Sequence, residues 1–380
     1  MSVFITKDFA IKLRQRLENP QGKYKNLAWE LAYQAECCMA EKPLSVTQFK
    51  SSAISQNPHD FYSEGKYEWP DPKNPDGPYI TRDGLDYPGR FLGHRSSLEK
   101  TTYNMLCLAA AGYYLHKPEY TAKAARLAQI WFLNSDTKMN PNMDYAQAVK
   151  GKCHGRGIGI IDCKTFIKVI CAADLFRFDG VQAETIEGLR GWFGEFLVWL
   201  TTSKNGLDEK AETNNHMSWW TVQTMAYSIF TGNKEIFDHC AELFKTRVLG
   251  QMNDHGSFDR ELERSRSYSY SMFNLQAMSF ICEMAHNQGV DLWRYKTPEG
   301  KTIERAVRFA MPYVDNPFSW PGRQIKGEEL HDELSLRLAA FRLDIPECQQ
   351  INEGRQVGYR LMKDDSMLGP IALLPEYDFN

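Results

Sequence analysis

Two short segments of this 380-residue chain carry side chains that can hold a carboxylate and move protons. Residues 212–216 read ETNNH, and residues 261–270, about fifty positions later, read ELERSRSYSY. Together they supply an amide, an imidazole, a guanidinium and a phenol. An enzyme needs this set when it neutralises a substrate carboxylate, removes the proton from the adjacent carbon and protonates a leaving oxygen. That chemistry is β-elimination on a uronic acid, so the pattern predicts a polysaccharide lyase.

Each of these side chains has an expected role. The hydrogen next to a carboxylate is hardly acidic, and preorganised donors aimed at the developing charge typically contribute about 3–4 kcal/mol each. Asn215 and Arg264 are suited to that task through an amide N–H and a forked guanidinium. His216 can donate to the carboxylate or act as a base. Tyr270 is the expected proton shuttle, and we expect Arg264 and Arg266 to favour its phenolate form.

The same residues can serve either epimer of the sugar. In mannuronate the C5 hydrogen and the C4–O bond lie on one face, so Tyr270 alone can take and return the proton. In guluronate they lie on opposite faces, which requires two groups, most simply His216 as the base and Tyr270 as the acid. The sequence leaves the preferred epimer open.

Each assignment competes with a structural alternative. His216 precedes an aromatic-rich helix and can be a core histidine, and Asn214 or Asn215 can cap that helix while the other binds substrate. The arginines can pair with nearby glutamates at helical spacing. Tyr268 competes with Tyr270, which we prefer from the phase of the following helix.

Composition excludes several classes of protein. The net charge is −3, from 45 basic and 48 acidic residues, and no basic stripe indicates nucleic-acid binding. Nine cysteines without a CxxC pair argue against a zinc ribbon or a thioredoxin-like site. No segment reaches the roughly 18 apolar residues of a membrane span. The N-terminus lacks a signal-peptide pattern, which fits either a cytoplasmic protein or a mature chain whose leader was removed. Of these we expect the mature chain, periplasmic or secreted, and keep the cytoplasmic location as the alternative.

Apolar residues recur at three- and four-residue spacing in most of the chain, which predicts an all-α fold. The predicted helices cover residues 25–41, 98–116, 119–133, 161–177, 186–202, 217–231, 235–248, 270–286 and 303–314. Short connections between long helices imply antiparallel neighbours. We therefore expect one catalytic domain, residues 1–380, forming an α/α barrel or toroid with long irregular loops lining a cleft.

Two long stretches interrupt the helices. Residues 60–95 are rich in Pro, Gly, Asp and aromatics, and form either a cleft wall presenting Trp69 or Tyr67 to a sugar, or a lid held by its own aromatics. Residues 139–162 contain three glycines but match a phosphate loop poorly. Their polar side chains are expected to gather at one rim of the cleft and bind substrate: Asn142, Tyr145, Gln147, His154 and Arg156.

Four blocks in this order resemble the alginate lyase superfamily of α/α-barrel polysaccharide lyases: FYSEGKYEWPDPKNPDG, MNPNMDYAQAVKGKCHGRGIGIID, ETNNHMSWW and ELERSRSYSYSMFNL. They span about residues 60 to 280. The resemblance implies that Asn215, His216, Arg264 and Tyr270 are catalytic, with Asn214, Arg266 and Tyr268 near the substrate. The Arg-to-Tyr segment is one residue shorter than in the best-known bacterial enzymes, which implies a distinct branch active on alginate or a related polyuronate such as glucuronan. Neither a cofactor nor a metal is expected, and a homodimer is left open.

Two rival functions remain at this stage. A glycoside hydrolase on the same toroid would use paired carboxylates, and the candidates are Asp162, Glu212, Asp259, Glu261 and Glu263. A helical sugar-binding module would use Trp69 and Trp219 as platforms. Only a lyase creates a C4–C5 double bond conjugated with the carboxylate, which absorbs ultraviolet light.

Overall fold

Four nearly all-buried helices form the inside of the molecule. The computed structural model describes residues 2–314, 316–325 and 334–345. The inner helices are α3 (Gly93–Tyr114), α5 (Phe166–Asp179), α8 (Asn215–Thr231) and α11 (Ser267–Asn287). They are apolar on most sides, as helices enclosed by other helices must be. Each packs against the next, from α3 to α5, α5 to α8 and α8 to α11.

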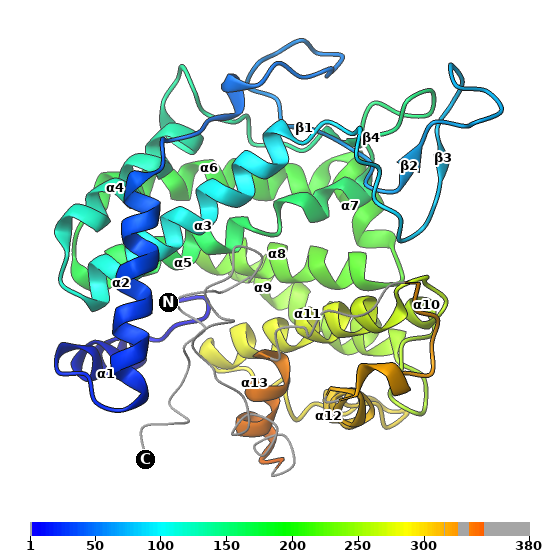
Figure 1. The fold of residues 1–380 in the computed structure, drawn as a ribbon. Helices are drawn as coiled ribbons and strands as arrows, with labels where there is room; N and C mark the ends of the chain where they lie inside the picture. Colours follow the sequence, from blue (N-terminus) through cyan, green and yellow to red (C-terminus); the bar gives the residue numbers. More distant parts are fainter. Residues whose placement is uncertain (1, 315, 326–333, 346–380) are drawn as a thin grey trace.

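One amphipathic helix follows each inner helix along the chain and returns it. These helices are α4 (Pro118–Ala128), α6 (Ala183–Thr202), α9 (Lys234–Leu243) and α12 (Ile303–Ala310). Because each return reverses direction, the inner helices run parallel, and all four begin at the same end of the molecule, beside the short strands (Figure 1). The predicted all-α architecture of helix hairpins arranged as an α/α barrel is confirmed.

The remaining elements surround this frame. The other α-helices are α1 (Lys7–Glu18), α2 (Lys23–Ala40), α7 (Lys204–Ala211), α10 (Asp259–Leu262) and α13 (Leu334–Leu343). Shorter 3₁₀ segments are η1 (Val46–Gln48), η3 (Gly157–Cys163), η5 (Leu249–Gln251), η6 (Met311–Tyr313) and η7 (Pro317–Ser319). Single π-helical turns follow α4 and α9 as η2 (Gln129–Leu133) and η4 (Phe244–Val248). The sequence analysis missed α1, α7, α10 and α13, and the predicted helical start at 161–165 instead continues η3 into a turn.

The two predicted loop stretches pair with each other. Strand β1 (Tyr62–Glu64) from the first runs parallel to β4 (Tyr145–Ala148) from the second. Strand β2 (Glu68–Trp69) pairs antiparallel with β3 (Ile80–Thr81) within the first. These short strands lie beside α7 and α10 at the end where the inner helices begin (Figure 1). Both loops are therefore placed over one end of the barrel.

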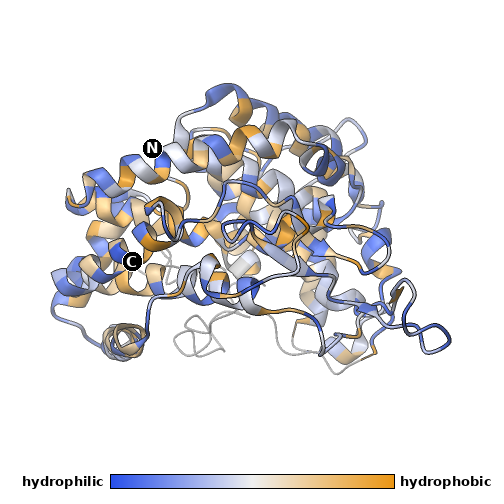
Figure 2. Ribbon diagram, turned by 90° about the horizontal axis from the view of Figure 1, so that it is seen from above, coloured by the Kyte–Doolittle hydropathy of each residue, from blue (hydrophilic) through white to orange (hydrophobic). Residues whose placement is uncertain are grey.

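Apolar burial is continuous through the helical body. A single cluster of buried hydrophobic side chains extends from Val3 to Ile345. Figure 2 shows hydrophobic positions interspersed along the helices, while the projecting loops are largely hydrophilic. In the part of the chain that the structure describes, no helix combines the length and apolarity needed to cross a bilayer.

The α3–α4 contact provides a test of this packing. A Cβ added at Gly112 would lie 2.2 Å from Thr121 Oγ1 and 2.9 Å from its backbone nitrogen, so the two helices would have to separate. We expect Gly112→Ala to lower the free energy of unfolding by about 1–3 kcal/mol. Gly191 lies in α6 with open space around its Cα, so Gly191→Ala should raise it by up to about 1 kcal/mol. Urea unfolding of both variants measures this, and equal effects would contradict the close contact.

Candidate active site

His216 is held by a buried carboxylate at the start of α8. The Asn214 side chain accepts a hydrogen bond from the His216 backbone nitrogen at 3.1 Å, so the predicted N-cap is present. His216 Nδ1 lies 2.9 Å from Oε1 of Glu209, a fully buried residue of α7. An ionised carboxylate only accepts, so Nδ1 carries the proton and Nε2 keeps its lone pair. Burial alone would lower the pKa of His216, but the Glu209 carboxylate outweighs it and raises this pKa.

The neighbouring Asn215 is directed at a second carboxylate. Its Nδ2 donates to both oxygens of Glu261, at 2.8 and 2.9 Å, and its backbone nitrogen donates to Oε1 at 2.7 Å. Both side chains are fully buried. This contact ties the start of α8 to α10, three residues before Arg264. In this state the amide N–H groups are turned to Glu261, so donation from Asn215 to a substrate carboxylate stays a prediction.

Arg264 is oriented by a residue from the first loop. Its Nε and Nη2 donate to Asp83 Oδ1 at 3.1 and 2.6 Å, while the Ser265 backbone nitrogen donates to Oδ2 at 2.9 Å. Although partial burial opposes it, these bonds lower the pKa of Asp83 to about 2. Within the described chain, Nη1 of Arg264 has no hydrogen-bond partner. One edge of the guanidinium is thus fixed, and one amino group remains for a ligand.

Tyr270 lies directly against this guanidinium. Arg264 Cζ is 3.7 Å from the centroid of the Tyr270 ring, and the Tyr270 hydroxyl is 2.6 Å from that of Tyr67. Burial and the second phenol raise the pKa of Tyr270, and Arg264 only partly offsets them. The expectation that the arginine would favour phenolate is right in sign but outweighed, so Tyr270 is held in its neutral, proton-donating form.

Tyr268 and Arg266, the other two candidates from residues 261–270, are not in contact with Arg264 and Tyr270 in the way that these two contact each other. Tyr268 is only 2% exposed and packs edge-on against Trp320 in the core, which corrects its predicted role in substrate binding. Arg266 lies at the start of α11 and forms an isolated β-bridge with Gln324. It is partly buried, and its role in binding substrate stays a prediction. Of the two competing phenols, Tyr270 is the one beside Arg264.

Gln147 and Arg156 form a polar network next to Tyr67. Arg156 donates to Glu68 Oε1 at 3.1 Å and to Gln147 Oε1 at 3.3 Å, and Gln147 Nε2 donates to Asp162 at 3.0 Å. Gln147 has a φ of 50°, a left-handed conformation uncommon for a residue other than glycine. It falls at the irregularity between β1 and β4. The predicted polar rim is therefore partly assembled, although these side chains bind one another in this state.

Three other predicted binding residues lie apart from the catalytic candidates. Trp69 donates to the Leu85 carbonyl oxygen, and Arg82 covers its ring at 5.0 Å, which favours the alternative of a loop held by its own aromatics. Tyr145 packs in a small apolar cluster with Tyr62. His154 is exposed and lines a pocket of about 590 Å³.

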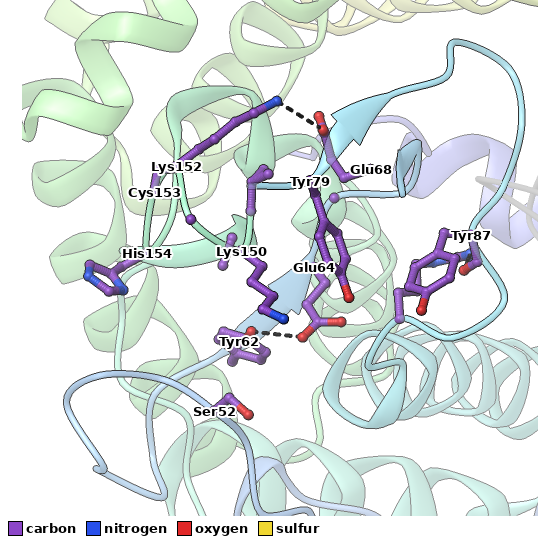
Figure 3. A pocket seen from close by; sticks show the side chains of 15 residues that line it. Ser52, Tyr62, Glu64, Glu68, Tyr79, Tyr87, Lys150, Lys152, Cys153 and His154 are labelled. Atoms are coloured by element: carbon purple, nitrogen blue, oxygen red, sulfur yellow. Dashed lines mark hydrogen bonds and ion pairs between the residues drawn. The ribbon is translucent and has the colours of Figure 1, made fainter. Parts of the chain in front are cut away.

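This pocket lies between the two loops, next to Tyr67. Figure 3 shows Lys150 extending toward Tyr62 and Glu64 on one wall, with Lys152 paired to Glu68 on another. Glu64 also accepts hydrogen bonds from the Tyr62 hydroxyl at 3.0 Å and the Phe91 backbone nitrogen at 2.7 Å. The lining includes none of the four predicted catalytic residues. The link that the structure shows is Glu68, a lining residue that directly follows Tyr67, whose hydroxyl contacts that of Tyr270.

The rival functions fit this geometry less well. Glu261 and Asp162 are buried and bonded to structural partners, and Asp259 accepts a hydrogen bond from Asn253 at 2.6 Å. A pair of carboxylates facing each other across a groove is not formed by these residues. Trp219 is fully buried and stacks on Phe273 at 4.7 Å, so it is no surface platform.

The start of α8 thus carries an imidazole, and the segment leading into α11 carries a guanidinium stacked on a phenol. These are the side chains expected of a polysaccharide lyase on an α/α barrel. The sequence pattern of the alginate lyase family matches residues 45–320, and the chain belongs to that family. The crystal structure of an alginate lyase from Bacteroides ovatus superimposes with a TM-score of 0.88 at 30% identity, covering 98% of this chain and 100% of that one.

More distant relatives share a shorter stretch. The alginate lyase of Pseudomonas fluorescens strain SBW25 is 31% identical over 145 residues, which span 38% of each chain. That of Cobetia marina is 29% identical over 152 residues, or 40% of this chain and 38% of the relative. The alignments thus span well under half the length of these curated relatives. Alginate lyase A1-III, solved with a tetrasaccharide, has a TM-score of 0.56 at 16% identity and shares the fold.

The sequence analysis missed the acidic partners of the site. Glu209, Asp83 and, in its observed role, Glu261 each hold one predicted residue in place. Glu209 lies seven residues before His216 but on another helix, whereas Asp83 lies 181 residues before Arg264. Only the two glutamates of the ELER segment indicated such pairing, and the sequence pattern predicted ion pairs at the surface for them.

The Glu209–His216 contact generates a titration test. Replacing the carboxylate by an amide removes the charge that raises the pKa of the imidazole, while burial remains. We therefore expect Glu209→Gln to lower the pKa of His216, measured by NMR of the ring protons against pH. Glu235→Gln, at an exposed position of α9, is the matched control and should leave it unchanged. An unaltered His216 titration in Glu209→Gln would refute the assigned charge contact.

Proposed function

We propose that this protein is a polyuronate lyase that cleaves alginate, or a related polymer such as glucuronan, by β-elimination. The observation that carries the proposal is the stacking of the Asp83-anchored Arg264 guanidinium on the Tyr270 ring, with Nη1 unoccupied. A cation with an open amino group beside a neutral phenol suits a substrate carboxylate next to a departing oxygen.

The residues divide the reaction between them. Arg264 Nη1 binds the carboxylate of the sugar to be cleaved and stabilises the charge that builds as the C5 proton leaves. His216 Nε2 takes that proton where it lies opposite the C4–O bond, and Glu209 stabilises the imidazolium that forms. Tyr270 protonates the leaving oxygen, after which the Tyr67 hydroxyl can share the charge left on it. The bond from C4 to oxygen breaks as the C4–C5 double bond forms.

Where the proton and the C4–O bond share a face, Tyr270 must act alone. It then has to lose its own proton first, which its raised pKa opposes. We therefore infer that the two-group route through His216 and Tyr270, which suits guluronate, is the better supported by this geometry. Glucuronate has the same configuration at C4 and C5 as mannuronate, so glucuronan would need the one-group route through Tyr270.

The pocket between the loops suits further sugars of the polymer. Lys150, Lys152 and Arg90 line it with Tyr79, so carboxylates and sugar faces both find partners there. His154 stands at its edge. We propose that the polymer passes from this pocket across Tyr67 to the catalytic group. A polymer of this size does not cross a bilayer unaided, which favours a periplasmic or secreted site of action.

The phenol provides the first test of the proposal. We expect Tyr270→Phe to reduce elimination by roughly 10²–10⁴-fold, the usual contribution of a general acid, while oligouronate binding persists. Absorbance of the unsaturated product measures the first effect and calorimetry the second. Tyr33→Phe is the control, because Tyr33 is 53% exposed and stacks only on Trp29. Near-normal turnover by Tyr270→Phe would reject the role of this phenol.

The imidazole distinguishes the two stereochemical routes. We expect His216→Ala to lose far more activity on polyguluronate than on polymannuronate or glucuronan, because only polyguluronate needs a base opposite the leaving oxygen. The same absorbance assay on the three polymers, without added cofactor, measures this. Equal losses on all three would show that His216 serves binding or structure rather than proton removal. Absence of new absorbance with the unmodified protein on every polymer would refute the lyase function itself.

A further inference from the structure

Lys164 is a cation of the barrel interior that the reaction described above does not use. It follows η3 and precedes α5, at the end where all four inner helices begin. Its side chain is partly buried, and Nζ lies 6.0 Å from the centroid of the Phe273 ring. Phe273 follows Tyr270 by three residues on α11, about one helical turn further along.

The contact with Phe273 places Lys164 on the open face of α11. Most of this helix is buried, but Ser269, Tyr270, Phe273 and Gln276 keep partial exposure. Their spacing of one, three and three residues puts them along one side of the helix. That side carries the proposed catalytic phenol, so the ammonium of Lys164 lies over the same side of α11, about one helical turn further along than Tyr270.

The cations around Lys164 are paired, but Lys164 is not. Of the cations whose charge acts on Lys164, Lys66 lies 3.5 Å from Asp86 and Arg95 lies 3.4 Å from Asp162. Among the described residues, no carboxylate comes within the 4.0 Å of Lys164 Nζ that defines an ion pair. The ring of Phe273 is the one close partner of Lys164 Nζ that the described part of the chain provides.

The surroundings of the Lys164 ammonium destabilise its positive charge when no anion is paired with it. Burial lowers the pKa of Lys164, and nearby Arg95 and Lys66 act in the same direction, against Glu99 and Asp162. Asp162 is already engaged by Ser63, Gln147 and Arg95, so it is not free to turn toward Lys164. A partly desolvated charge of this kind gains most from an anion supplied by a ligand.

We infer that Lys164 binds the carboxylate of a second uronate, adjacent in the polymer to the one that Arg264 holds. The inference rests on the proposed function, and it narrows the substrate class to polymers with carboxylates on consecutive sugars. Polymers that alternate a uronate with a neutral sugar would leave this ammonium unpaired and would be poorer substrates. An ammonium is a point charge without a fixed hydrogen-bonding plane, so it can accept the carboxylates of different epimers.

Removal of the charge tests the inference by separating binding from chemistry. We expect Lys164→Met to raise KM on polyguluronate about tenfold to hundredfold, the range for one charged hydrogen bond, with kcat changed little. Lys164→Arg should retain most of the affinity. The control, Lys234→Met, removes an exposed lysine that pairs only with Asp238 on α9 and should leave KM unaltered. An unchanged KM in a folded Lys164→Met protein would overturn the inference.

Direct observation of the amine provides a second measurement that does not depend on turnover. In the Tyr270→Phe background, ¹³C-methylated lysines are titrated by NMR with and without an oligoguluronate, and the Lys164 signal is assigned by its loss in Lys164→Arg. We expect the oligouronate, but not a neutral cello-oligosaccharide of equal length, to raise the pKa of this amine. No change with the oligouronate bound would overturn the inference, even if Lys164→Met fails to fold.

The two proposals can fail separately. If the unmodified protein produces no unsaturated product, the lyase function fails, while calorimetry of oligoguluronate binding with and without Lys164→Met still reports on the amine. If elimination occurs and Lys164→Met binds consecutive and alternating uronans with unchanged affinity, only the inference about Lys164 fails.

Discussion

The carboxylate of Asp162 is the contact on which the catalytic end of the molecule depends. Its side chain is 1% exposed, accepts hydrogen bonds from Ser63 at 2.6 Å and Gln147 at 3.0 Å, and pairs with Arg95 at 3.4 Å. One buried group thereby fastens β1, β4 and α3 to the segment before α5. A buried charge is stable only with such complete pairing, and the pairing in turn sets where Tyr67 meets α11.

The same logic recurs at each functional side chain. Arg264 is held by Asp83, His216 by Glu209 and Asn215 by Glu261. Each acid fixes one edge of its partner, and the opposite edge of the arginine and of the imidazole stays unoccupied within the described chain. Because the anchored guanidinium of Arg264 needs no reorganisation when charge develops on a ligand, it can act at full strength in the transition state. The acids therefore set geometry and charge together, without touching the reacting atoms.

The long helices and the Asn214 cap could be predicted from the sequence because both depend on local patterns of a few residues. The pairing of Tyr67 with Tyr270 could not, since the two phenols are 203 residues apart and no periodicity links them. Tyr268 and Tyr270 differ by two positions, so helical rotation alone sends one to the core and the other to the groove. The choice between a sugar platform and a self-held loop at Trp69 could not be made from the sequence, because it depends on Arg82, whose guanidinium lies over the Trp69 ring. The hydrogen-bond partners of the polar side chains could not be predicted from the sequence. Which groups pair depends on which ones are buried together, and that is decided only when the whole barrel is assembled.

The shared starting end of the four inner helices has an electrostatic consequence. Each helix carries partial positive charge at its beginning and partial negative charge at its end, and parallel alignment adds these macrodipoles instead of cancelling them. The overall charge of −3 would weakly repel a polyanion from most directions. The loop-bearing end is the exception, because the beginnings of four helices converge there. The electrostatic field would thus guide an anionic polymer toward the loop-bearing end of the barrel. The orientation in which polymer and protein meet is then set by the parallel helices before any specific contact forms.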